Sequence, residues 1–569
     1  MSAKARTLSH RVAGIFNVGL AIVSLSMSSP ASADQLQDGA AAYRHGEFAK
    51  ALHLLKPLAA HGDAYAAMTL GLIYAKGQGV AQDYAQAAAW YRKAADRGNA
   101  FAQANLGLLY AEGRGLEQDF AEAAKYYRKA ADQGIAFAAG SLALLYARGQ
   151  GVKQDYAEAA IWYRKAADKG DANAQVNLAN LYLHGNGVAK DDDQAAFWLR
   201  KAANQGNSYA QTTLAYLLGQ GRGGKQDPAA AAALYRKAAN NGDANAQFRL
   251  AELLANGTGV AKDDAEAASW FEKAAAQGNV TAQSILGIRY AEGRGVPKDL
   301  VKAAEFYRKA ADKGDHAATI NLANLLSTGT PGITRDDAQA AVLFQKAAAQ
   351  GDVFAESSLG SLYETGRGVK QDYAQAVVWY RKAADAGDIA AASNLGRLYT
   401  QGLGTSQDFT AAAIYERKAA EHGLVKAQVA LAQLYEKGNG LKQDYAQAAA
   451  WYRKAADQGD IFAQTTLGLF YAKGLGVKRD YAEAAIWYQK AAGHGDPLAQ
   501  SNLGLLYAYG EGVKQDYVEA YKWFNLAAGH GSTNSRNKAT GNLKIIAGKL
   551  SAQQIKQAQQ LTAEWKPAL

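Results

Sequence analysis

The residues that could perform chemistry in this sequence are scattered rather than grouped. The nine histidines form no His-Glu-x-x-His motif and no pair at the spacing of a zinc site, and the chain has no cysteine. A zinc-dependent or thiol-dependent reaction is therefore not predicted, and neither is a disulfide. Five of the histidines are expected at surface or turn positions: His184, His316, His422, His494 and His530.

Two further motifs could bind phosphate or calcium, but each lacks part of its site. Gly-x-Gly recurs, as at Gly77–Gly79, yet it follows a predicted helix rather than a strand and has no third spaced glycine. The Asp191–Asp193 run lacks the glycine and terminal glutamate of a calcium loop, so it is predicted to cap a helix. No Gly-x-Ser-x-Gly motif occurs, and similar acids in every repeat single out no glycosidase pair. We predict no catalytic residue, metal site or cofactor.

These residues are carried by a repeated unit, which is the strongest signal in the 569-residue chain. The Asp that opens DYAQAAAWYRKAADRG at Asp83 returns every 36 residues as far as Asp299. After one extra residue near Pro331, the same step runs from Asp336 to Asp516, which makes thirteen copies. With only 7 prolines and no linker-like stretch, the chain is predicted to be one array rather than a set of separate domains.

Each copy is predicted to form two short helices. The second begins at the Asp, an N-cap that ten copies follow with Gln or Glu at capping-box spacing, and it ends at a glycine such as Gly98. The first helix, as in Ala100 to Glu112, ends at the Gly113–Gly115 turn. Because such short helices are unstable alone in water, stacking on neighbours must stabilise them.

Apolar positions indicate how the helices stack. In the first helix the position of Gly107 is always Gly or Ala, which predicts that a partner backbone comes close there. In the second helix, alanines and an aromatic pair such as Trp90-Tyr91 fill the space, and eight of the nine tryptophans occupy this register. A stripe that repeats in nearly every unit predicts core packing rather than a series of ligand sites.

The repeat resembles the Sel1-like repeat, a relative of the tetratricopeptide repeat. The pattern A-x-x-x-LG-x-x-Y-x-x-G-x-GV-x-x-D-x-x-x-A-x-x-W-x-x-x-AA-x-x-G occurs in Ala100 through Gly134 and in copies over residues 64–532. The resemblance implies an all-α solenoid, a right-handed superhelix of about thirteen 36-residue helix pairs, and a role as adaptor or scaffold. Some relatives with a disulfide in each repeat are linked to β-lactam binding, and the lack of cysteine departs from that branch.

The N-terminus is predicted to be a signal peptide over residues 1–33. A basic head, an apolar stretch over residues 12–27 and small residues from Ala31 to Ala33 form the pattern of a cleaved leader. Asp34 would then be the first mature residue, in the periplasm or outside the cell. The alternative is a single membrane anchor, which is disfavoured because the stretch is short and contains Asn17. No later apolar run could span a membrane, so the mature chain is not expected to be membrane-embedded.

Residues 34–63 and 533–569 are predicted to form helical caps on the two ends of the array. At the C-terminal end, Ser551 and Gln554 have capping-box spacing, and Ile555, Ala558 and Leu561 fall on one side of the helix that follows. A terminal unit of this kind covers the apolar face that the last repeat would otherwise expose.

The charge of the chain predicts a solvated helix surface rather than a nucleic-acid site. The formal charge of +10 falls to +7 when the three basic residues of the leader are removed. Many of the remaining basic residues are Arg-Lys pairs at one repeated position, such as Arg92-Lys93, followed shortly by an acidic or polar residue. We therefore expect no nucleic-acid partner.

Positions that the core does not need predict where a partner binds. If the array curves as its tetratricopeptide relatives do, the first helices line the concave face. There, the position after the small residue is Leu at both ends of the array and diverse in the middle, and aromatics recur seven residues earlier. The predicted partner-binding residues are Tyr65, Phe101, Phe137, Asn180, Tyr209, Tyr216, Glu252, Asn324, Phe354, Arg397, Gln433 and Phe462. The alternative is neutral variation at solvent positions.

Together these features predict an exported scaffold or adaptor without a reaction of its own. Its expected partners are proteins or peptides, components of the cell envelope among them, bound through the concave face. One alternative is an envelope enzyme or binder that acts on peptidoglycan or β-lactams, which would need a cluster of titratable groups with perturbed pKa in one pocket. The other is a structural rod that associates with itself.

Overall fold

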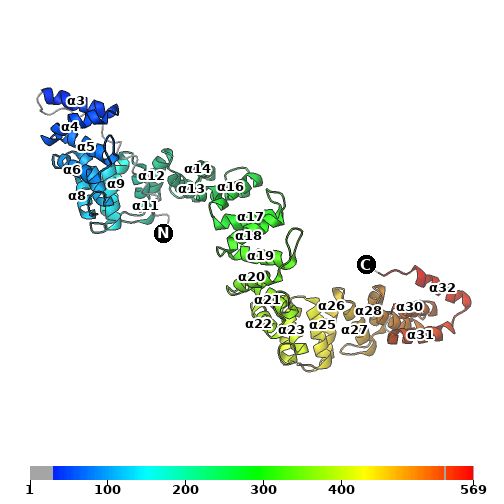
Figure 1. Ribbon diagram of the computed structural model, residues 1–569. Helices are drawn as coiled ribbons and strands as arrows, with labels where there is room; N and C mark the ends of the chain where they lie inside the picture. The colour runs from blue at the N-terminus through cyan, green and yellow to red at the C-terminus, as the bar shows by residue number, and fades with distance from the viewer. Residues whose placement is uncertain (1–29, 531–532, 568–569) are drawn as a thin grey trace. The chain divides into compact units, whose positions relative to one another are not determined.

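The structure is a computed structural model that describes residues 30–530 and 533–567 (Figure 1). These residues form thirty helices, α3 to α32, and no strand beyond an isolated bridge between Thr330 and Ile333. The chain divides into two compact units between Lys298 and Asp299. Most of the predicted leader, residues 1–29, lies outside the described residues. In the described part of the chain, no helix is both long and apolar enough to cross a membrane.

The first unit contains two N-terminal helices and then, from α5, first helices with odd numbers and second helices with even numbers. Their bounds are α3 (Pro30–Arg44), α4 (Phe48–Ala60), α5 (Ala64–Lys76), α6 (Tyr84–Asp96), α7 (Ala100–Glu112), α8 (Phe120–Asp132), α9 (Ala136–Arg148), α10 (Tyr156–Asp168), α11 (Ala172–His184), α12 (Asp192–Asn204), α13 (Ser208–Gln220), α14 (Pro228–Asn240), α15 (Ala244–Asn256), α16 (Asp264–Ala276) and α17 (Val280–Glu292).

The second unit continues the same alternation and ends with two helices outside the repeat. Their bounds are α18 (Leu300–Ala311), α19 (His316–Thr328), α20 (Asp337–Ala348), α21 (Val353–Thr365), α22 (Tyr373–Asp385), α23 (Ile389–Gln401), α24 (Phe409–Glu421), α25 (Val425–Lys437), α26 (Tyr445–Asp457), α27 (Ile461–Lys473), α28 (Tyr481–Gly493), α29 (Pro497–Tyr509), α30 (Tyr517–His530), α31 (Thr533–Ala547) and α32 (Ala552–Glu564).

The helices of each unit stack in chain order. From α3 to α17, and again from α18 to α31, each helix packs against the one before it and the one after it. Neighbouring first helices also contact one another directly, as α5 contacts α7 and α27 contacts α29. The fold is therefore the all-α solenoid that the repeat predicts.

The ends of the helices are fixed by the residue types that the sequence indicates. The Asp83 carboxylate accepts a hydrogen bond from the Gln86 backbone N–H at the start of α6, and the Asn99 side chain accepts one from the Ala102 N–H at the start of α7. First helices end at a left-handed glycine, such as Gly113 with φ of 67°. The full capping box, with both hydrogen bonds, forms at the start of α32. Local sequence thus sets most helix boundaries, although α9 and α25 begin after Ile135 and Leu424 with no side-chain cap.

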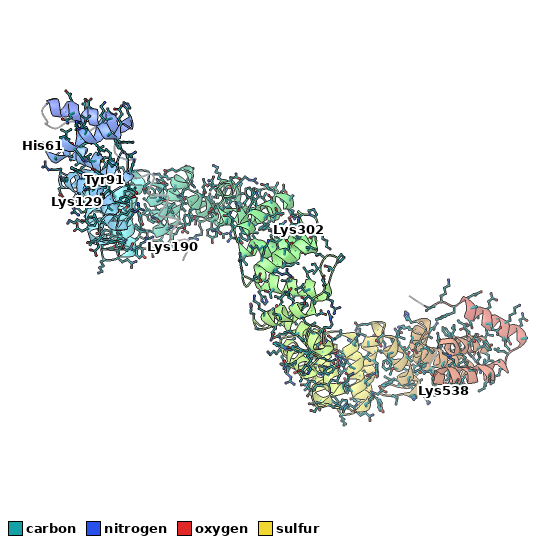
Figure 2. The ribbon with its side chains drawn as sticks, viewed as in Figure 1. His61, Tyr91, Lys129, Lys190, Lys302 and Lys538 are labelled. Carbon is teal, nitrogen blue, oxygen red and sulfur yellow. The ribbon has the colours of Figure 1, made fainter. Side chains whose placement is uncertain are left out.

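Of the aromatic pair Trp90-Tyr91, Tyr91 lies in the core, as predicted, and Trp90 is partly buried; the small residue of the first helix lies against the core ring. Tyr91 is completely buried, whereas Lys129 lies at the surface (Figure 2). A Cβ atom added to Gly71 would lie 2.5 Å from the Tyr91 ring. The small position therefore makes room for the aromatic ring of the paired second helix. The predicted approach of a partner backbone is also seen at Gly107, where an added Cβ atom would lie 3.3 Å from the Ala123 carbonyl oxygen and 2.9 Å from the Tyr127 ring.

The repeated arginines join successive repeats. Arg453 on α26 donates a hydrogen bond to the Tyr471 hydroxyl on α27, and its guanidinium lies over the Trp487 ring of α28. The Lys454 ammonium lies 3.7 Å from the centroid of the Trp451 ring. The same donation links Arg92 with Tyr110, Arg128 with Tyr146, Arg164 with Tyr182, Arg381 with Tyr399 and Arg417 with Tyr435. These contacts give the Arg-Lys pairs a role in packing.

The C-terminal helices cover the last repeat. Both α31 and α32 pack against α30, and Ile546 and Ala558 are buried with Phe524 in one apolar cluster. Trp565, which follows α32, lies against the repeat over residues 461–496. A Cβ atom added to Gly495 of that repeat would lie 3.7 Å from the Trp565 ring. The apolar end of the stack is thereby shielded from water.

Candidate interaction surface

The predicted partner-binding residues all lie on first helices. They occupy two positions seven residues apart, so their side chains emerge from one face of each helix. In the first unit this face carries Tyr65, Phe101, Phe137, Asn180, Tyr209, Tyr216 and Glu252. In the second unit it carries Asn324, Phe354, Arg397, Gln433 and Phe462. We call this the first-helix face of each unit.

Several aromatic rings on this face are half exposed and yet held in place. Tyr209, Phe354 and Phe462 expose 53%, 48% and 51% of their surface. The Phe354 and Phe344 rings meet in an edge-type contact with centroids 6.1 Å apart, and the Phe462 and Tyr452 rings do so at 6.2 Å. The Phe354 and Phe462 rings are therefore oriented by a buried aromatic of the preceding second helix. A partner that covers these two rings would lose little binding energy to restricting their motion.

In the first unit, polar residues of this face pair with one another or with near neighbours. The Tyr209 hydroxyl donates to Asn180 Oδ1 at 3.4 Å, which joins two successive first helices. Glu252 accepts a hydrogen bond from Arg249, three residues earlier on the same helix, at 2.8 Å. The sequence placed Asn180 and Tyr209 on one surface, and the structure brings these two into contact.

In the second unit, Arg397 is engaged by an acid that the sequence analysis did not identify. Its Nη2 atom lies 2.5 Å from Glu364 Oε1, on the preceding first helix, and the Tyr380 hydroxyl donates to Glu364 Oε2 at 3.0 Å. Arg397 is thus part of a network with Glu364 and Tyr380. Asn324 remains exposed, and Gln433 is half buried.

A second acid that the sequence did not single out, Glu416, is acted on by Arg397 of this network. Glu416 on α24 is buried at a position that the other second helices fill with an aromatic ring or, in α12, with Leu199, and the Ser393 hydroxyl donates to its Oε2 at 3.2 Å. Burial raises the pKa of Glu416 to about 8, while Ser393 and Arg397 act in the opposite direction. Aligning the thirteen copies would have identified it, because it is the one acid in that register.

The candidate metal-binding residues have structural roles. Asp191 caps α12, and Asp192 accepts hydrogen bonds from the Arg222 guanidinium at 2.8 and 2.9 Å, which lowers the pKa of Asp192. His316 Nε2 lies 3.1 Å from Asp352 Oδ2, and its side chain is partly covered. Over residues 30–530 and 533–567, no group of three or more His, Asp or Glu side chains could hold a metal ion.

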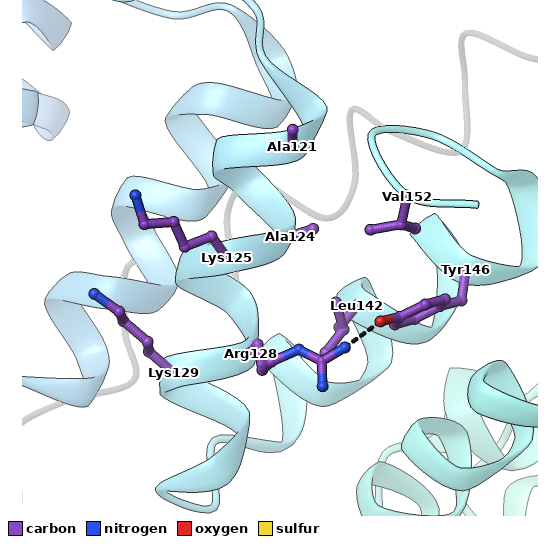
Figure 3. Close-up of a pocket in the computed structure, with 8 residues that line it drawn as sticks. All are labelled: Ala121, Ala124, Lys125, Arg128, Lys129, Leu142, Tyr146 and Val152. Carbon is purple, nitrogen blue, oxygen red and sulfur yellow. Dashed lines mark hydrogen bonds between the residues drawn. The ribbon is translucent and has the colours of Figure 1, made fainter. Parts of the chain in front are cut away.

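A shallow pocket of about 380 Å³ lies between α8 and α9 (Figure 3). Its lining is largely apolar, with Leu142 and Val152 among its residues, and Arg128 donates to the Tyr146 hydroxyl along one side. The Lys125 ammonium points away from Tyr146 and Val152 (Figure 3). The eight lining residues include no carboxylate and no imidazole, so they do not form the acid and base pair that the enzyme alternative needs.

Comparison with known proteins matches this geometry to one family. The family model for the Sel1 repeat matches thirteen consecutive segments, from residues 64–99 to residues 497–532. The chain is similar to the crystal structure of c5321, a protective antigen of uropathogenic Escherichia coli strains with an SLR fold. The two share 34% identity over 84% of this chain and 94% of that one, with a TM-score of 0.53.

A second solved structure with the same identity is a Sel1 repeat protein from Oxalobacter formigenes. It shares 34% identity over 58% of this chain and 93% of its own, with a TM-score of 0.44. A comparison with curated protein sequences finds no match.

Proposed function

The chain belongs to the Sel1 repeat family, and from this premise we propose that it is an exported scaffold that binds a protein or peptide partner through its first-helix face. Sel1 repeat proteins and related solenoids are generally protein-interaction scaffolds. The observation that carries the proposal is the set of half-exposed, pre-oriented aromatic rings on the first helices. We assign no reaction to the protein itself.

The first-helix face suits an extended partner for two physical reasons. Aromatic side chains that are already held by the core give large contact areas at low entropic cost, which is typical of residues that dominate binding energy. Between them, Asn180, Asn324 and Gln433 offer amide donors and acceptors that can pair with the main chain of a peptide. In each unit, therefore, the first-helix face carries both apolar anchors and polar contacts.

The proposal also includes export, for which the leader pattern is the support. A basic head, an apolar stretch and the small residues before Asp34 are typical of a cleaved signal peptide. The expected location is the periplasm or the outside of the cell, where envelope proteins are the available partners. The mature protein isolated from cells should accordingly begin at Asp34.

Replacing Tyr216, Asn324 and Arg397 together by alanine should reduce partner capture at least tenfold, since each removes a side chain from the first-helix face. The measurement is affinity capture from intact envelopes with the mature chain as bait, followed by crosslinking and mass spectrometry. Helicity and melting temperature should not change, because none of the three residues lies in the apolar core.

Two control variants make this result specific. Glu364→Gln weakens the ion pair of Arg397 but keeps the guanidinium on the surface, so it should retain capture. Alanine at Ile161, Val378 and Ile486 removes equally exposed apolar groups from second helices and should also retain capture. Full capture by the triple variant, with normal helicity, would count against the first-helix face.

A further inference from the structure

One core position of the second helix is apolar in twelve of the thirteen repeats and acidic in the remaining one. The acid is Glu416, and it is 2% exposed, like Tyr380 at the same position one repeat earlier. A carboxyl group thus occupies a place that its neighbours fill with a ring. The twelve other residues are Tyr91, Tyr127, Tyr163, Leu199, Tyr235, Phe271, Tyr307, Phe344, Tyr380, Tyr452, Tyr488 and Phe524.

The surroundings of Glu416 are apolar and tight. A Cβ atom added to Gly396 on α23 would lie 2.7 Å from Glu416 Cγ, so the side chain lies flat against that helix. Helices α23, α24 and α25 contribute to one buried apolar cluster, which includes Leu395, Ala412 and Leu431. The Ser393 hydroxyl is a single neutral donor to the carboxyl group. Such an environment stabilises the protonated carboxyl over the carboxylate.

The charged residue of α23 that acts on Glu416 is already paired with an acid on α21, the preceding first helix. Arg397 is the charged residue that acts on Glu416, and its guanidinium lies 2.5 Å from Glu364 Oε1. Glu364 also accepts the Tyr380 hydroxyl hydrogen bond. Arg397 therefore shares its charge with a second, more exposed carboxylate and does not form an ion pair with Glu416.

The charged groups on α24 itself and on α25 have other partners or lie in solvent. Arg417 donates to the Tyr435 hydroxyl at 2.6 Å, and Lys418 donates to the Ala384 carbonyl. On α25, Glu436 accepts a hydrogen bond from the Tyr452 hydroxyl at 2.7 Å. The remaining charged side chains, which are exposed, are those of Glu421, Lys426 and Lys437.

We propose that Glu416 makes the α23–α24 helix pair a proton-operated element, closed while the carboxyl group is protonated and opened when that group loses its proton. The carboxylate needs water or a cation, and it can reach water only if α23 and α24 separate. Opening would expose apolar core and move Arg397, which α23 carries. This inference does not depend on the proposed binding function.

The direction of the pH response follows from the two states of the carboxyl group. Burial raises the pKa of Glu416 from 4.5 to about 8 in the closed state, whereas the opened state exposes it to water. At pH values between 4.5 and about 8, Glu416 carries a proton in the closed state and has lost it in the opened state. Each unit of pH increase should therefore lower the closing equilibrium tenfold, or about 1.4 kcal/mol. The stabilisation is complete below pH 4.5 and is lost as the pH rises through about 8.

Hydrogen exchange of the full mature chain at pH 6 and pH 8 tests this proposal. After correction for the intrinsic exchange rate, protection of the α23 and α24 amides should fall about 50-fold between the two pH values, because half of the closed molecules are already ionised at pH 8. The α27 and α28 amides serve as the internal control, because Tyr488 holds the same position there. Equal protection of α23 and α24 at both pH values would overturn the proposal.

Three variants separate the carboxyl group from other causes of pH dependence. Glu416→Gln keeps the shape but cannot ionise, and Glu416→Tyr restores the ring of the other repeats, so both should remove the pH dependence. Glu436→Gln removes a carboxyl group of the next repeat that accepts a tyrosine hydroxyl, and it should keep the pH dependence. A fall in protection that persists in Glu416→Gln would also refute the proposal.

Discussion

Gly476→Ala should destabilise its repeat by about 3–5 kcal/mol, whereas Gly459→Ala should cost about 1–2 kcal/mol. Both glycines have positive φ, 63° and 92°, so both substitutions carry the strain of a left-handed alanine. They differ in what the new Cβ atom meets. At Gly476 it would lie 2.1 Å from the carbonyl carbon of Tyr445, at the start of the preceding second helix, and at Gly459 it would meet nothing within 4 Å.

Urea unfolding of the mature chain, combined with hydrogen exchange, measures this difference. Because each repeat contacts only its neighbours, the loss of protection in Gly476→Ala should be greatest in α26 and α27. The pair of variants isolates the contact between repeats from the conformational preference of glycine. Similar losses of stability in the two variants would mean that the turn containing Gly476 does not pack against the preceding repeat.

Tyr488→Ala should lower the free energy of unfolding by about 3–5 kcal/mol, because it removes a buried ring and leaves a cavity. Tyr488 is 2% exposed, and a Cβ atom added to Gly468 would lie 2.7 Å from its ring. Burial also raises the pKa of the Tyr488 hydroxyl, which keeps it neutral over the ordinary pH range. Thermal and urea unfolding, with hydrogen exchange at α27 to α29, give the measurement.

Two further variants test whether the loss of stability in Tyr488→Ala comes from the loss of a buried ring. Tyr488→Phe should remain close to the wild type, because Phe271, Phe344 and Phe524 hold the same position in other repeats. Tyr509→Ala removes a tyrosine that is 69% exposed and should change stability by no more than about 0.5 kcal/mol. If Tyr488→Ala behaved like Tyr509→Ala, the aromatic register would not be the core of the array.

The repeat made the fold predictable to the level of single helices. The helix predicted over Ala100 to Glu112 is α7, with the same bounds. This agreement has a physical cause, since an Asn or Asp cap, an apolar face and a left-handed glycine specify the same boundary in copy after copy. The aromatic pairs were likewise assigned to the core from their periodicity alone: Tyr91 is fully buried, and its neighbour Trp90 is partly buried.

Contacts between repeats were less predictable, because they depend on how neighbouring units are seated. The ion pair of Arg397 joins it to Glu364, 33 residues earlier, on another first helix. No local spacing rule connects two such positions, and the side chains meet only after the helices stack. Glu416 differs in this respect, since a comparison of the thirteen copies would have shown an acid at an apolar position.

The central claim is that a partner binds the first-helix face, and site-specific photocrosslinking tests it most directly. A photoreactive phenylalanine analogue would be placed singly at Tyr209, Phe354 or Phe462 on first helices, and at Ile161, Val378 or Ile486 on second helices. Both sets are about half exposed, from 45% to 53%, so reach and solvent access are matched. We predict crosslinks to the partner from the first-helix positions. Crosslinks from the second-helix positions alone would contradict the claim.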